Sequence, residues 1–147
     1  MNNYRRAGVL MNITSLPGKY GIGVMGDDAR KFVDQLCEMN FRYWQVLPLN
    51  PTDASGSPYC SYSAFAGNIA LIDPYTLFEK GFVTQADIKE CEYDGSIYCT
   101  DYDFAYKTRM ALLKKAFNNI DCDSASLIRI FGCSKISGLR GHAKCLP

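Results

Sequence analysis

Residues 43–49 read YWQVLPL, an apolar run rich in β-forming residues that ends near a proline, and this pattern is typical of a buried strand. An earlier run, AGVLM at residues 7–11, predicts another short buried strand. Between them, residues 27–40 carry apolar side chains at spacings of three and four, which predicts an amphipathic helix. These side chains are Ala29, Phe32, Val33, Leu36 and Met39. Strand, helix and strand at this spacing predict a βαβ unit with a parallel pair of strands, and hence an α/β fold.

Composition and charge exclude several classes of protein. The chain has 147 residues and a net charge of +1, and no stripe of basic residues argues for a nucleic-acid partner. No apolar run approaches the ~18 residues of a membrane span. The seven cysteines form no C-x-x-C pair and there is one histidine, so we expect free thiols and no metal site. These features predict a cytoplasmic protein without a nucleic-acid or membrane partner.

A glycine-rich motif precedes the predicted helix. Residues 21–26 read GIGVMG, which spells the G-x-G-x-x-G of dinucleotide-binding folds. That motif must follow its strand directly, whereas here the strand ends near Met11 and Pro17 intervenes. No acid follows the second strand to hold a ribose. We therefore interpret the motif as a tight loop in which glycine permits close packing.

Beyond the second strand, residues 50–68 form a long polar segment rich in Ser, Gly and Pro. Loops of this length without secondary structure are commonly functional or disordered, and the aromatic residues in this one indicate an ordered surface. Asp73 can then cap a short helix, and residues 104–118 predict a longer one. The face expected to pack is the one that carries Tyr106, Met110, Leu113 and Phe117.

Three stretches in this order resemble the N-terminal part of the 4-α-glucanotransferase (amylomaltase) family. They are RAGVL at 6–10 with SLPGKYGIG at 15–23, then YWQVLPL at 43–49, then SPY at 57–59 with SAFAGN at 63–68 and LID at 71–73. The resemblance covers about residues 4–118. It implies the N-terminal part of a (β/α)8 TIM barrel with insertions, incomplete in this chain. It also implies transfer of α-1,4-glucan segments to glucose or maltooligosaccharide acceptors, with retention and without a cofactor.

The resemblance assigns a role to the loop at 50–68, since substrates of such barrels bind at the C-terminal ends of the strands. It implies that Ser57 and Tyr59 contact the glucan, and Pro58 stiffens the turn between them. Tyr59 offers a ring for the C–H face of a glucose unit and a hydroxyl for its rim. Ser63 and Asn68 could bind sugar or, equally well, hydrogen-bond the loop backbone.

The residues that would perform catalysis are not expected in this chain. Retaining transfer needs two carboxyl groups about 5–5.5 Å apart, and the family's pair comes from strands beyond residue 147. We therefore expect an inactive fragment of an enzyme family, with no catalytic residue of its own. The alternatives are a non-catalytic glucan-binding remnant or another α-glucan-acting barrel enzyme, and the SPY loop favours the first family. Two strands without neighbours should leave the isolated chain prone to aggregation.

The composition changes near residue 120. Three of the seven cysteines and the only histidine follow Asp121, whereas all ten tyrosines precede it. We accordingly expect residues 1–119 to be the N-terminal part of the barrel and residues 120–147 to be an atypical tail, either divergent, disordered or read out of frame.

Overall fold

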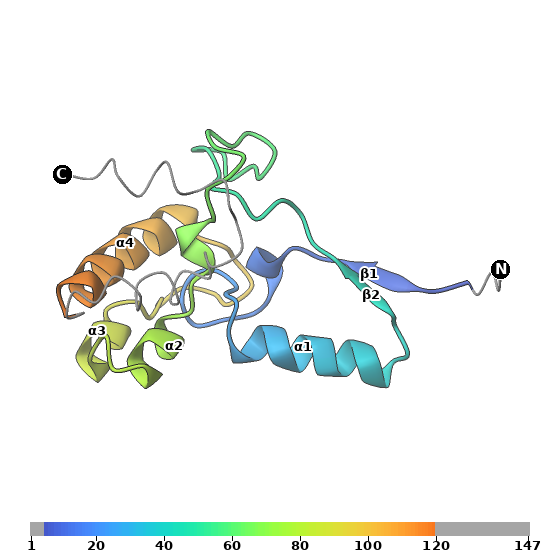
Figure 1. Cartoon of the computed structure of the whole chain (residues 1–147), viewed down its shortest axis with the longest axis horizontal. Helices are drawn as coiled ribbons and strands as arrows, with labels where there is room; N and C mark the ends of the chain where they lie inside the picture. Colours follow the sequence, from blue (N-terminus) through green and yellow to red (C-terminus); the bar gives the residue numbers. More distant parts are fainter. Residues whose placement is uncertain (1–4, 120–147) are drawn as a thin grey trace.

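The computed structural model describes residues 5–119, which contain a small parallel sheet, two 3-10 turns and four helices. In Figure 1, β1, β2 and α1 lie alongside one another and extend away from the part that holds α2, α3 and α4. The elements in chain order are β1 (Gly8–Leu10), η1 (Ile13–Ser15), α1 (Asp27–Glu38), β2 (Tyr43–Gln45), η2 (Ile69–Leu71), α2 (Pro74–Glu79), α3 (Gln85–Lys89) and α4 (Tyr102–Asn118).

The predicted βαβ unit is confirmed. β1 pairs with β2 in parallel, with Val9 opposite Trp44, and α1 connects the two strands. The amide of Met11 donates to the carbonyl of Gln45 at 3.0 Å and so extends the pairing by one bond. The sheet has two strands within residues 5–119.

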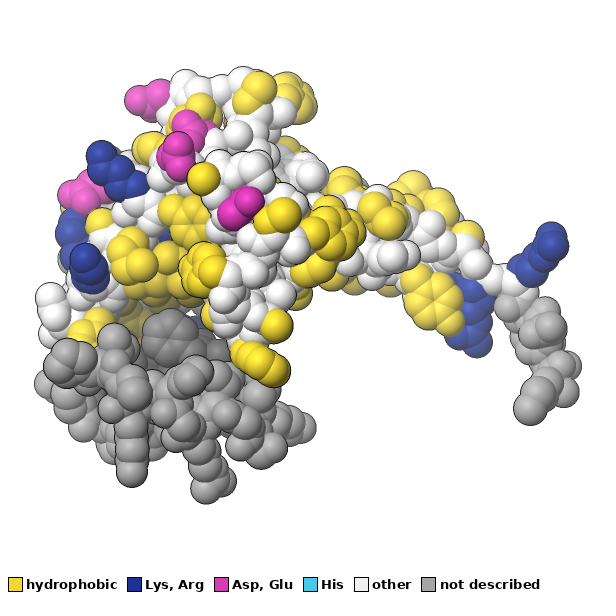
Figure 2. Space-filling model, turned by 90° about the horizontal axis from the view of Figure 1, so that it is seen from above, with side chains coloured by type: hydrophobic (Ala, Val, Ile, Leu, Met, Phe, Trp, Pro, Cys, Tyr) yellow, Lys and Arg dark blue, Asp and Glu magenta, His cyan; other side chains and the backbone are white. Residues whose placement is uncertain are grey.

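The expectation that both strands are buried is wrong. Leu10 is 61% exposed and Tyr43 is 55% exposed, and each strand is only three residues long. The physical reason is that a parallel strand is buried by neighbouring strands and by helices on both faces. In the part of the chain that the structure describes, this sheet has one helix beside it and no third strand. Figure 2 accordingly shows hydrophobic side chains along the outside of this part of the molecule.

Two hydrophobic clusters hold the described residues together. The smaller one joins the sheet to α1: Trp44 packs edge-on against Phe32 with ring centroids 5.0 Å apart, and its indole N–H donates to the carbonyl of Met11 at 2.8 Å. This places Trp44 in packing, as expected, and not on an open surface. Of the predicted helix face, Leu36 is buried and Phe32 and Ala29 contact this cluster, whereas Val33 and Met39 are exposed.

The larger cluster lies among α2, α3 and α4, and local caps position the first two of these helices. The carboxylate of Asp73 accepts from the amides of Tyr75 and Thr76 at 3.1 and 3.3 Å, which confirms the predicted cap of α2. Thr84 and Asp87 form a reciprocal capping box at the start of α3.

The buried face of α4 differs from the predicted one. The buried residues are Ala105, Arg109, Leu112 and Ala116. Tyr106 and Leu113, from the predicted face, are half-buried, and Met110 and Phe117 are exposed. Sequence patterns give most weight to large apolar side chains, whereas the buried face of this helix holds two alanines, a leucine and an arginine. Within the described residues, no helix is long and apolar enough to cross a membrane.

Candidate functional site

The loop at residues 50–68 begins shortly after β2 and contains no helix or strand, as predicted. Its two ends meet, because the amide of Asn68 donates to the carbonyl of Leu49 at 2.9 Å. The loop therefore leaves the C-terminal side of β2 and returns to it as a closed excursion. Within these residues the only charged side chain is Asp53.

Asp53 organises the first turn of the loop. One of its carboxylate oxygens accepts from the amide and the hydroxyl of Ser55 at 3.0 and 2.6 Å, and from the amide of Ser57 at 3.3 Å. These hydrogen bonds, the Ser55 hydroxyl first, hold the pKa of Asp53 below its ordinary value. The carboxylate is thus already engaged by the loop itself, so its role is to shape the turn that presents Ser57.

Ser57, Pro58 and Tyr59 follow this turn on the surface. The Ser57 hydroxyl accepts from the amide of Tyr59 at 3.4 Å, which leaves its proton free to donate elsewhere. Pro58 is half-buried, and Tyr59 is 72% exposed. Tyr62 and Phe65, further along, are exposed as well. The loop therefore presents aromatic rings and hydroxyls to solvent, with Asp53 as its one charged side chain.

Ser63 and Asn68 are both engaged in the backbone of the loop. The Ser63 hydroxyl accepts from the amides of Phe65 and Ala66 at 3.3 and 3.2 Å. Asn68 is buried, and its side-chain oxygen accepts from the amide of Ala70 at 2.9 Å, which caps η2. The sequence left open whether these two side chains bind sugar or the loop backbone. In the structure, both of them accept hydrogen bonds from backbone amides. Sugar contacts by these two residues stay predictions.

The loop is attached to α4 by contacts that the sequence patterns did not predict. The Tyr106 hydroxyl accepts from the amide of Thr52 at 3.0 Å, and Thr52 is buried. Gly56 adopts φ of 74° next to the ring of Tyr102, and a Cβ at Gly56 would lie 2.9 Å from that ring. Because these partners are about fifty residues apart, no local pattern could have paired them. The one indication in the sequence was the glycine at position 56, because glycine readily adopts the left-handed conformation found there.

The glycine motif at 21–26 behaves as a packing loop. Gly21 has φ of 75°, and a Cβ on Gly23 would overlap the carbonyl oxygen of Ile13. Neither glycine is placed to follow a strand, since β1 ends at Leu10. Among residues 5–119, no group of three acidic, cysteine or histidine side chains could hold a metal ion. The four cysteines in this range are free thiols.

The chain is similar to known 4-alpha-glucanotransferases. The family model described as 4-alpha-glucanotransferase matches residues 11–135. A 4-alpha-glucanotransferase of Aquifex aeolicus is 46% identical over 117 residues, which is 78% of this chain and 23% of the relative. One of Thermus thermophilus is 48% identical over 113 residues, which is 77% of this chain and 22% of the relative.

A solved structure agrees with these relatives. The amylomaltase from Streptococcus agalactiae in complex with acarbose matches with a TM-score of 0.77 and 39% identity, over 86% of this chain and 26% of that chain. The chain thus spans about a quarter of the length of the relatives it matches. The family match continues to residue 135, which lies outside the described residues. The predicted division at residue 119 and the predicted atypical tail remain untested.

Proposed function

The chain belongs to the 4-alpha-glucanotransferase family, and from that premise we propose that it is the N-terminal part of a (β/α)8 barrel that transfers α-1,4-glucan segments between acceptor sugars with retention. The observation that carries the proposal is the exposed aromatic loop at the C-terminal end of β2, in a chain 48% identical to the 4-alpha-glucanotransferase of Thermus thermophilus over 113 residues. In barrels of this kind the strand ends form the site.

The chemistry of the loop supports a neutral sugar as its ligand. A glucose unit needs a flat apolar surface for its C–H face and short polar groups for its hydroxyls. Tyr59 offers the first, being mostly exposed, and Ser57 offers a hydroxyl proton. Pro58 limits the motion of the turn between them. Ser63 and Asn68 act in the proposal by holding the loop through their backbone hydrogen bonds.

For the chain by itself we propose substrate contact without turnover. Retention requires a nucleophile and an acid/base carboxyl about 5–5.5 Å apart. In the described loop the one carboxylate, Asp53, is occupied by Ser55 and Ser57. We place the catalytic pair outside this chain. The chain's coverage of about a quarter of its relatives also favours a second candidate, a glucan-binding remnant without activity.

Disproportionation of maltotriose separates catalysis from binding. The purified chain, incubated with maltotriose, should release no glucose and form no longer maltooligosaccharide, measured by chromatography of the products. Steady turnover would mean that the carboxylates lie within these residues and that their proposed location is wrong. Binding without turnover is the result expected for both the inactive fragment and the remnant.

Tyr59 provides the test of the loop. In the same chain, Tyr59→Ala should abolish the binding of maltotriose by the loop while leaving stability within about 0.5 kcal/mol, as for other exposed positions. Tyr59→Phe, which keeps the ring, is the matched control and should retain most of the binding. A loss of stability in Tyr59→Ala as large as that in Trp44→Ala would instead identify Tyr59 as a packing residue.

A cytoplasmic location belongs to the same proposal. Its support is the absence of disulfides among residues 5–119, where Cys37, Cys60, Cys91 and Cys99 are free thiols. Reduced thiols are the normal state of cysteine in the cytosol.

A further inference from the structure

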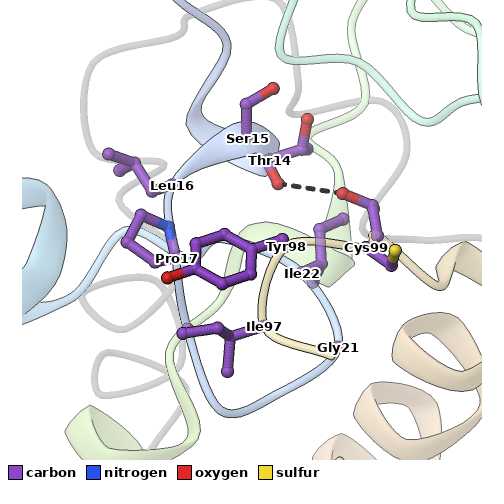
Figure 3. A pocket seen from close by; sticks show the side chains of 11 residues that line it. Thr14, Ser15, Leu16, Pro17, Gly21, Ile22, Ile97, Tyr98 and Cys99 are labelled. Carbon is purple, nitrogen blue, oxygen red and sulfur yellow. Dashed lines mark hydrogen bonds between the residues drawn. The ribbon is translucent and has the colours of Figure 1, made fainter. Parts of the chain in front are cut away.

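A cavity lies away from the 50–68 loop, between the turn that follows β1 and the segment that leads into α4 (Figure 3). Its volume is about 230 Å³. Thr14 to Gly18 with Gly21 and Ile22 form one wall, and residues 97–100 form the other. The proposed glucan loop contributes no residue to it.

Contacts between segments far apart in the sequence build this pocket. The amide of Asp101 donates to the carbonyl of Gly21 at 2.7 Å, and the amide of Tyr93 donates to the carbonyl of Lys19 at 2.8 Å. The Tyr102 hydroxyl donates to the hydroxyl oxygen of Thr14 at 3.3 Å. Both walls are therefore fixed relative to one another, and the pocket is present before any ligand arrives.

The lining of the pocket is chemically specific. None of its residues carries a charge, which leaves nothing to neutralise a phosphate or a carboxylate. Tyr98 is 88% exposed, and Figure 3 shows its ring on the same side of the pocket as Pro17. Ser15 is exposed, and the Thr100 hydroxyl donates to the carbonyl of Thr14 at 3.3 Å, so its lone pairs remain available as acceptors.

We propose that this pocket binds one sugar ring of a neutral saccharide, with the ring of Tyr98 against the C–H face and the hydroxyls of Ser15 and Thr100 at the rim. An aromatic ring with a polar edge matches a ligand that has both kinds of surface. The identity of the saccharide as an α-glucan rests on the proposed function. Tyr102 contacts both regions, since its ring lies beside Gly56 and its hydroxyl reaches Thr14.

Cysteine labelling tests the pocket, because Cys99 lines it and is an exposed free thiol. The full chain is treated with iodoacetamide, with and without maltotriose, and the rate at each cysteine is read by peptide mass spectrometry. When the maltotriose concentration equals the dissociation constant, half of the pockets are filled and Cys99 labelling should slow about twofold. Cys37 on α1 is the reference thiol, and sorbitol at equal concentration controls for hydroxyl groups without a ring face.

Two substitutions sharpen the result. Tyr98→Ala should abolish the protection of Cys99, whereas Tyr43→Ala, at an exposed tyrosine on β2 outside both the pocket and the 50–68 loop, should preserve it. Cys60 lies in the 50–68 loop and reports on the proposed function separately. Slowing at Cys60 alone would leave the proposed function standing and overturn this pocket.

Three other outcomes also overturn the proposal. Equal protection of Cys99 by sorbitol would show that no sugar ring is recognised. Cys91 is buried, so labelling of Cys91 as fast as that of Cys37 would show that the chain does not form the pocket. Protection at neither Cys99 nor Cys60 would contradict both the pocket and glucan binding by the loop.

Discussion

Arg109 is fully buried in α4, and replacing it should reveal the free energy that a buried charge costs this fold. All three of its side-chain nitrogens lack a hydrogen-bond partner in the described part of the chain. Its guanidinium carbon lies 5.2 Å from the centroid of the Tyr20 ring, and burial lowers the pKa of Arg109 from its ordinary value. The Cys91 sulfur, the Tyr20 ring and the Asp73 carboxylate are the neighbours that favour the charged form, and none of them accepts a hydrogen bond from it.

Arg109→Met keeps most of the volume of the stem and removes the charge. Losing the cation–π contact costs about 2 kcal/mol in a desolvated setting. Replacing buried ionic groups by well-packed apolar ones is neutral or stabilises a protein by about 1–4 kcal/mol, even when those groups are paired. In the described residues, the Arg109 guanidinium has no acceptor for its hydrogen bonds. The upper figure less the lost contact leaves a net gain of at most about 2 kcal/mol in the free energy of unfolding, measured by urea titration of the full chain with circular dichroism.

Arg109→Ala separates charge from volume. It also removes the charge but leaves a cavity, so it should be less stable than Arg109→Met by about 2–5 kcal/mol. A loss of more than about 1 kcal/mol in Arg109→Met, at an unchanged urea slope, would mean that the guanidinium has a strong acceptor. The reasoning from an unpartnered buried cation would then be wrong.

Three further perturbations probe the packing around the site. Asp73→Ala removes the cap of α2 and should lower the free energy of unfolding by about 1–2 kcal/mol, with a smaller loss in Asp73→Asn, measured by urea titration. Hydrogen bonds from Lys115 and then Thr84 lower the pKa of Asp87 to about 2, below its ordinary 3.8; the stability this adds is present above about pH 4, is lost as the pH falls toward 2, and should shrink in Lys115→Met, which keeps the Thr84 contacts. Gly23→Ala should lower the thermal midpoint because its Cβ overlaps a backbone carbonyl, whereas Gly67→Ala, with open space around it, should not.

Local patterns were sufficient for the features that depend on near neighbours in the chain. The two strands and the helix between them follow from apolar spacing, and their parallel pairing follows from the length of the connection. The cap at Asp73 lies within three residues of the amides it binds. The extended loop at 50–68 is likewise evident from its composition.

Tertiary structure decided what depends on distant partners. The buried face of α4 carries Ala105, Arg109, Leu112 and Ala116, whereas the large apolar Met110 and Phe117 are exposed. The burial of a strand depends on neighbours, and in the described residues Leu10 has too few to be covered. The attachment of the loop through Thr52 and Tyr106 joins residues whose proximity no local spacing encodes. Sequence periodicity reports which side chains share a face, whereas only the assembled chain determines what that face contacts.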